Sequence, residues 1–127
     1  MTEHAHGGHR ARCLETCTAC FQSCNACFQA CNAALLHCIE KLAAGETFYA
    51  SCATLFADCP EFCITCERLM TCKSGFTEFS AYAGAQACLG CAAACDEHAA
   101  DAVLVALAKT CRKCAESCTA MHKIPPP

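Results

Sequence analysis

Residues 13–38 read CLETCTACFQSCNACFQACNAALLHC, and cysteine recurs there at steps of four, three, four, three, four and seven. This is the spacing of the core-facing positions of an α-helix in a bundle, with sulfur where leucine normally stands. The cysteines are Cys13, Cys17, Cys20, Cys24, Cys27, Cys31 and Cys38. The stretch predicts a long helix whose buried side is a row of thiols, which is either an unusual hydrophobic core or a set of metal ligands.

Three later segments repeat this spacing. Their core-facing positions are Cys52, Phe56, Cys59, Cys63, Cys66 and Met70, then Ala81, Gly84, Cys88, Cys91, Cys95 and His98, and then Leu104, Leu107, Cys111, Cys114, Cys118 and Met121. Cys72 lies off the row near a helix end. The alternation with period two that is typical of strands is absent. The fold class is therefore predicted to be all-α.

Four helices are expected, running from about Arg10 to Ala44, Thr47 to Lys73, Thr77 to His98 and Asp101 to His122. Gly45 suits the end of the first helix and Asp101 the N-cap of the fourth. Pro60 predicts a kink, or two abutting helices that meet near Asp58. Short turns favour an antiparallel four-helix bundle with a Cys-lined core over residues 11–123, between a flexible His-rich tail (1–10) and a C-terminal tail (124–127).

Composition limits the function classes. The chain has 127 residues, a net charge of −3 and 18 cysteines, about 14 per cent of the sequence and above the level that marks a disulfide or metal scaffold. It has no basic face for nucleic acid and no apolar run long enough to span a bilayer. Residues 1–12 lack the apolar segment of a secretory signal. We therefore expect a cytoplasmic protein with reduced thiols.

Non-metal interpretations account poorly for so many cysteines. Free cysteine is a small buried residue, but this does not explain its place at almost every core position of one helix. Residues three or four apart on a helix have Cβ atoms about 5–6 Å apart, whereas a disulfide needs about 3.5–4.5 Å. Disulfides between helices stay possible on spacing alone. Metal binding fits the pattern better.

The pattern also bears on which metal is bound. Structural zinc takes closed sets of four ligands, and iron–sulfur clusters take a few cysteines supplied by loops. Cu(I) favours soft thiolate ligands, and bridging thiolates along a helix give a capacity of about one ion per cysteine, roughly 18 here. An apolar interior cannot hold so many unpaired thiolates, so neutral thiols are expected in a bundle that is already folded before metal binds.

The runs Cys13-Leu-Glu-Thr-Cys17-Thr-Ala-Cys20, His37-Cys38-Ile39-Glu40, Cys88-Leu-Gly-Cys91-Ala-Ala-Ala-Cys95 and Cys111-Arg-Lys-Cys114-Ala-Glu-Ser-Cys118 resemble those of bacterial copper storage proteins. The resemblance covers roughly Arg10 to Lys123. It implies Cu(I) ions bound inside each bundle through cysteine, and assembly as a homotetramer. The chain is similar to the cytosolic members of the family, which lack an export signal. The methionines that some members cluster at the mouth of the bundle are missing between Lys41 and Ser51.

Histidine and methionine add weaker candidate ligands. His37 and His98 should lie near one end of the bundle, and Met70, Met121 and His122 near the other. His98 continues the row of Cys95, which favours that end for copper uptake, although an incidental role for each is the competing interpretation. If Met1 is removed, His4 becomes the third residue of a free N-terminus and resembles an amino-terminal Cu(II) or Ni(II) site. A solvated tail is the alternative.

The sequence thus predicts a Cu(I) storage protein rather than an enzyme. Its partners would be copper ions, chelators and copper-transfer proteins, with no nucleic acid or membrane. The alternatives are a metallothionein-like protein that binds zinc or cadmium, and an iron–sulfur or redox protein. No Cys–His–Asp/Asn grouping or phosphate-binding glycine loop supports catalysis. Apolar rows that start at Leu14 and Phe48 either widen the core or form an outer face for oligomerisation.

Overall fold

The computed structural model describes the backbone of residues 2–122 and the side chains of residues 15–121. Its elements are α1 (Thr2–Ala43), a 3₁₀ turn η1 (Thr47–Tyr49), α2 (Ala50–Thr71), α3 (Thr77–Asp96) and α4 (Ala102–His122). Residues 2–122 contain no strand, which confirms the all-α class.

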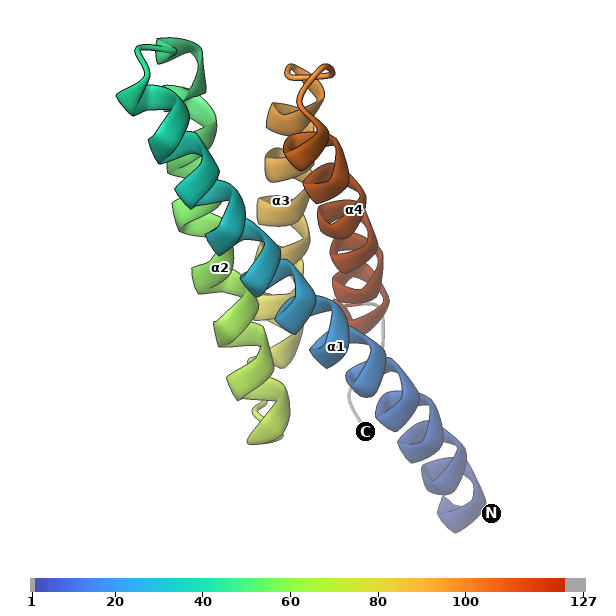
Figure 1. Ribbon diagram of the computed structural model, residues 1–127. Coiled ribbons are helices and arrows are strands. Elements are labelled where there is room, and N and C mark those ends of the chain that lie inside the picture. Colours follow the sequence, from blue (N-terminus) through green and yellow to red (C-terminus); the bar gives the residue numbers. More distant parts are fainter. Residues whose placement is uncertain (1, 123–127) are drawn as a thin grey trace.

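Successive helices run antiparallel and form one bundle (Figure 1). α1 packs against α2 and α4, and α3 packs against the same two helices. Over residues 2–122 the backbones of diagonal helices do not come within 8 Å of each other, Cα to Cα, so the four helices surround a common axis that their side chains fill. This is the up-and-down four-helix bundle that the short turns predict.

Several helix bounds differ from those expected. α1 begins at Thr2 instead of near Arg10, and its first turns project beyond the other helices (Figure 1). No proline interrupts this segment, and Gly7 and Gly8 weaken a helix without ending it. Residues 47–49 form η1 ahead of α2, and α3 ends at Asp96 instead of His98. That residues 1–10 behave as a flexible tail stays a prediction, and residues 124–127 lie outside the described chain.

α2 runs without a break through Pro60, so the alternative of two abutting helices is wrong. A proline lacks the N–H that would bond to the carbonyl one turn earlier, but the hydrogen bonds on both sides of that gap remain available. Pro60 is buried and Cys59 and Cys63 both face the core. The proline therefore does not change which side of α2 carries its cysteines.

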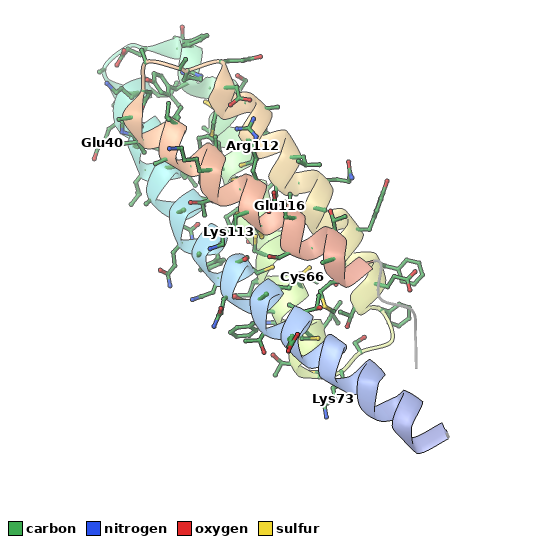
Figure 2. All side chains as sticks on the ribbon, turned by 90° about the vertical axis from the view of Figure 1, so that its right-hand side faces the viewer. Glu40, Cys66, Lys73, Arg112, Lys113 and Glu116 are labelled. Carbon is green, nitrogen blue, oxygen red and sulfur yellow. The ribbon has the colours of Figure 1, made fainter. Side chains whose placement is uncertain are left out.

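Charged residues lie on the outside of the bundle and sulfur lies inside. Figure 2 shows Glu40, Lys113 and Glu116 pointing away from the axis, while Cys66 lies between the helices. The α1–α2 turn is closed by Gly45, whose φ of 89° suits glycine, and by a bond of 3.0 Å from the Glu46 N–H to the Lys41 carbonyl. No described helix combines the length and apolar character that crossing a membrane requires.

Candidate metal centre

The core of the bundle consists mainly of thiols. Fifteen of the described cysteine side chains are buried, and we call them the sulfur row. They are Cys20, Cys24, Cys27, Cys31, Cys38, Cys52, Cys59, Cys63, Cys66, Cys88, Cys91, Cys95, Cys111, Cys114 and Cys118. None of the described cysteines forms a disulfide, which argues against a disulfide core over residues 15–121. Phe56 and Leu104 are the largest fully buried side chains of the described residues.

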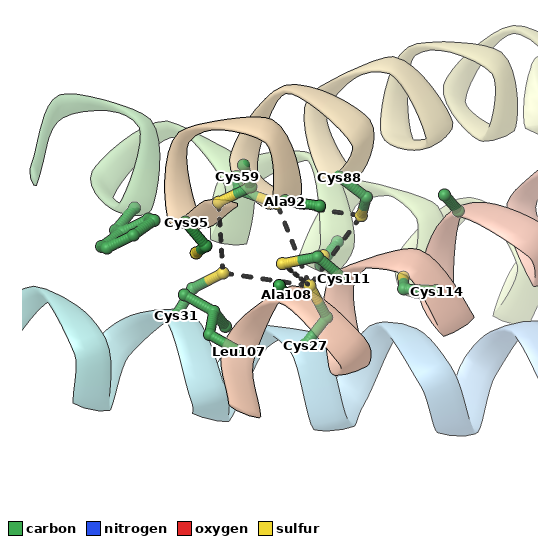
Figure 3. Close-up of a cluster of buried hydrophobic side chains, with 14 of the residues drawn as sticks. Cys27, Cys31, Cys59, Cys88, Ala92, Cys95, Leu107, Ala108, Cys111 and Cys114 are labelled. Carbon is green, nitrogen blue, oxygen red and sulfur yellow. Dashed lines mark hydrogen bonds between the residues drawn. The ribbon is translucent and has the colours of Figure 1, made fainter. Parts of the chain in front are cut away.

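Sulfur atoms from all four helices meet around Cys27 (Figure 3). Its Sγ lies 3.9 Å from the Sγ atoms of Cys31 and Cys59 and 3.8 Å from those of Cys88 and Cys111. These distances are far longer than a disulfide bond of about 2.05 Å. A metal–thiolate bond is about 2.3 Å long, so two sulfurs on one ion lie at most about 4.6 Å apart. The spacing therefore suits sulfurs that share metal ions.

Four groups of cysteines are compact enough to hold an ion, with all Sγ atoms of a group within 4.8 Å of one another. The groups are Cys27–Cys63–Cys88–Cys114, Cys20–Cys24–Cys118, Cys27–Cys31–Cys111 and Cys31–Cys59–Cys91. Cys27 and Cys31 each belong to two groups. Three of the groups therefore overlap, and the Cys20–Cys24–Cys118 group joins them through Cys24, whose Sγ lies 3.8 Å from Cys114 Sγ.

The sulfur row ends differently at the two ends of the bundle. The loop end contains the turns at residues 44–49 and 97–101, with Cys38, Cys52 and Cys95. The termini end contains the start of α1, the end of α4 and the turn at residues 72–76. Leu104 and Leu107 fill the core beside the loop end, and Ala81 fills it beside the termini end. Cys72 is exposed and joins none of the described sulfur groups.

His98 closes the sulfur row at the loop end. Its Nε2 lies 3.4 Å from Cys52 Sγ, and its ring is buried against the rings of Phe48 and Tyr49, at centroid distances of 4.1 and 4.6 Å. His37 reaches the same end but bonds to Asp101 Oδ2 at 2.8 Å. The structure thus places His98, and not His37, beside a thiol.

Asp101 ties three elements together at the loop end. Its Oδ2 accepts bonds from Tyr49 Oη at 2.6 Å and His37 Nε2 at 2.8 Å, while its Oδ1 accepts the backbone N–H groups of Val103 and Leu104. The last two bonds confirm the predicted N-cap of α4. The first two fix α1 and η1 to that cap.

At the termini end, Cys17 Sγ donates to Met121 Sδ at 3.6 Å, and Met70 is partly buried against the core. A Cβ at Gly84 would lie 3.2 Å from Cys66 Sγ and 3.4 Å from Cys118 Sγ, so glycine leaves space there for two sulfurs. The candidate ligands His4, Cys13 and His122 have side chains outside the described part of the chain.

Burial and neighbouring thiols hold Cys20, Cys38 and Cys95 in their protonated form. Burial is the main cause that raises the pKa of Cys38 to about 12, and the charge of Cys52 adds to it. Burial likewise raises the pKa of Cys95 to about 12, with a smaller contribution from the charge of Cys91. At Cys20, hydrogen bonding with Cys118 and Cys24 and then burial raise the pKa. A metal ion that binds here at neutral pH must therefore displace protons.

The carboxyl group of Asp101 is charged at neutral pH. Burial alone would raise the pKa of its carboxyl group, but the bonds from Tyr49 and His37 outweigh burial and lower it to about 2. The bond to Asp101, followed by burial, raises the pKa of the Tyr49 hydroxyl to about 12. The loop end thus carries a fixed negative charge that is bound by two donors.

A model of copper storage proteins matches residues 4–123, nearly the whole chain. The chain belongs to the copper storage protein family. No curated protein matched its sequence significantly.

Solved structures of copper storage proteins share the fold. Apo copper storage protein 3 from Bacillus subtilis is 30% identical with a TM-score of 0.73, over 83% of this chain and 97% of that one. A Cu(I)-bound copper storage protein, BsCsp3, is 28% identical with a TM-score of 0.78, over 84% and 98%. A cytosolic copper storage protein from Streptomyces lividans, solved with five coppers, is 24% identical with a TM-score of 0.77, over 85% and 93%, and supports the fold alone.

Some features of the site were not apparent from the sequence. Asp101 was recognised as a helix cap, but its bonds to His37 and Tyr49 join residues 64 and 52 positions apart. The contact of Cys17 with Met121 spans 104 positions. No local spacing signals such pairs, because they depend on how the helices lie side by side.

Proposed function

We propose that this chain binds and stores many Cu(I) ions, about one per cysteine, inside its four-helix bundle. The observation that carries the proposal is the array of buried sulfurs drawn from all four helices, in which many neighbouring Sγ atoms lie 3.8–3.9 Å apart and candidate groups span at most 4.8 Å. Soft thiolates favour Cu(I), and a copper ion accepts two or three of them. Bridging thiolates balance the charge of the ions in an apolar interior.

Zinc binding is the second candidate, and one group favours it. Cys27, Cys63, Cys88 and Cys114 form a buried set of four, the number that structural zinc requires. Cys27 also belongs to the group with Cys31 and Cys111. A closed zinc site on the set of four would therefore remove one ligand from that second group. Shared sulfurs suit Cu(I) bridges better than separate tetrahedral sites.

An anaerobic titration of reduced apo protein with Cu(I), competing against a chelator of known affinity, tests this proposal. Uptake should continue to about 18 ions per chain and release about one proton per ion, because an apolar interior favours neutral thiols before metal binds. Helical circular dichroism should stay unchanged, since we expect the bundle to be folded before metal binds. Saturation near one ion per four cysteines, or preferential retention of Zn(II) in competition, would support the zinc candidate instead.

We further propose that the chain assembles as a homotetramer. Phe62, Leu69, Phe76 and Phe79 line an apolar groove of about 380 Å³ between α2 and α3, and Phe76 and Phe79 are 69% and 65% exposed. Exposed apolar area of this kind is typical of an interface between copies. Sedimentation at micromolar concentration should give a species of about four times the 13.4 kDa chain mass, and a monomer would contradict the assembly.

In this proposal the protein acts in the cytoplasm as a store and not as an enzyme. Its partners are the small chelators or copper-transfer proteins that deliver and remove Cu(I). The support is the placement of the chemistry: the described sulfurs are almost all inside the bundle, where they can hold ions but cannot contact a larger substrate.

A further inference from the structure

Access to the sulfur row differs between the two ends of the bundle. At the loop end, Cys38, Cys52 and Cys95 are at most 1% exposed, and His98 is covered by aromatic rings. At the termini end, Cys17 is only partly buried. Among the described cysteines of the core-facing row, Cys17 is the one that solvent reaches.

Cys17 has a second soft ligand beside it. Met121, from the last turn of α4, places its Sδ 3.6 Å from Cys17 Sγ. This separation is within the limit of about 4.6 Å for two sulfurs on one ion. A thiolate and a thioether are both soft donors and select Cu(I) over harder ions. The pair therefore has the chemistry and the spacing of a two-coordinate copper site.

The pair is directly continuous with the buried array. Cys17 precedes Cys20 by three positions on α1, and Met121 follows Cys118 by three positions on α4, so each lies one helical turn outside its neighbour. Cys20 and Cys118 have Sγ atoms 3.8 Å apart and belong to one candidate group with Cys24. An ion on the pair could reach this group by exchanging ligands.

We propose that Cys17 and Met121 form the acceptor site through which Cu(I) enters the bundle, at the termini end. The inference rests on the proposed storage function, and it departs from the sequence-based preference for the His37 and His98 end. It assigns Cys17 and Met121 a role in transfer as well as in holding copper.

The transfer consists of ligand exchange with no change of oxidation state. Cys17 releases its proton to solvent and its sulfur bonds to a Cu(I) ion that is still bound to the donor. Met121 Sδ then replaces the last donor ligand. Cys20 or Cys118 next loses a proton and binds the ion as Met121 leaves. A neutral thioether is well suited to this intermediate step, because no charge has to be separated when it leaves.

Met121→Leu tests the site, since it removes the sulfur and keeps the volume. Transfer of Cu(I) from its bicinchoninate complex to reduced apo protein is followed by stopped-flow absorbance without oxygen. We expect the initial rate to fall about tenfold, as for the loss of one ligand of modest strength, while the final capacity stays at the wild-type value. Cys17→Ser should slow transfer as well and lower the capacity by about one ion.

Two matched variants act as controls. Met70→Leu removes a thioether from the same end and should load at the wild-type rate. His98→Ala removes the candidate ligand at the loop end and should slow loading less than Met121→Leu does. Wild-type rates in both Met121→Leu and Cys17→Ser would overturn the proposal, as would slow loading in His98→Ala alone. A wild-type chain that does not bind copper would instead refute storage, so the two failures are distinguishable. If Met121→Leu loses helicity, the initial transfer rate of Cys17→Ser relative to wild type tests the proposal instead.

Discussion

Replacing Phe56 by cysteine should raise the copper capacity by about one ion and lower the stability of the apo protein by about 2–4 kcal/mol. Phe56 is fully buried at the core-facing position of α2 between Cys52 and Cys59. A thiol there would complete the row on α2 and add a soft ligand. The smaller side chain would also leave a cavity, which explains the loss of stability.

Phe56→Ala is the matched control, because it removes the ring without adding sulfur. It should destabilise the apo protein by about 3–5 kcal/mol and leave the capacity unchanged. Native mass spectrometry of the loaded chains counts the ions, and chemical denaturation without metal measures the free energy of unfolding. Equal ion counts in the two variants would show that an added thiol at this position is not used. Equal stability of Phe56→Cys and wild type would contradict the packing role of the ring.

Asp101→Ala should lower the free energy of unfolding of the apo protein by about 3 kcal/mol. The substitution removes the cap of α4, worth about 1 kcal/mol, and leaves His37 Nε2 and Tyr49 Oη without their acceptor, at about 1 kcal/mol or more each. Asp101 makes none of the described sulfur contacts, so the equilibrium copper capacity should not change. Denaturation and ion counting on the same variant separate the two effects.

Asp101→Asn is the control for charge, because asparagine also caps helices well. The pKa of Asp101 in the folded protein, about 2, is lower than its ordinary value of 3.8. Its charge therefore stabilises the fold above about pH 4, and this contribution is lost as the pH falls towards 2. Acid titrations should show that wild type loses more stability than Asp101→Asn over this range. Parallel curves would contradict a stabilising charge at this position.

The sequence was sufficient to predict the bundle because its signal is local. Steps of three and four residues place one side of each helix inside, and short turns leave antiparallel neighbours as the simple solution. In an up-and-down bundle of four helices the last helix lies antiparallel beside the first. Cys27 and Cys111 are in contact, and so are Cys20 and Cys118.

Features that depend on lateral packing were harder to predict. Cys72 lies only six positions after Cys66, yet it follows the last turn of α2 and points to solvent. Pro60 suggested a break that the structure does not have, because the rest of α2 buries its side chains on one continuous face. The bonds of Asp101 to His37 and Tyr49 require α1, η1 and α4 to lie at matching positions along the bundle axis. No pattern within one helix specifies this alignment.

The sharing of Cys27 and Cys31 between neighbouring groups has a consequence for how a loaded bundle would empty. If an ion leaves from one end, the vacancy can move inwards, since each shared sulfur lets the next ion shift by exchanging one ligand. The ions would then move in single file along the bundle axis. The last ion to bind would be the first to leave. All the bound ions could leave through one end of the bundle without any helix having to unfold.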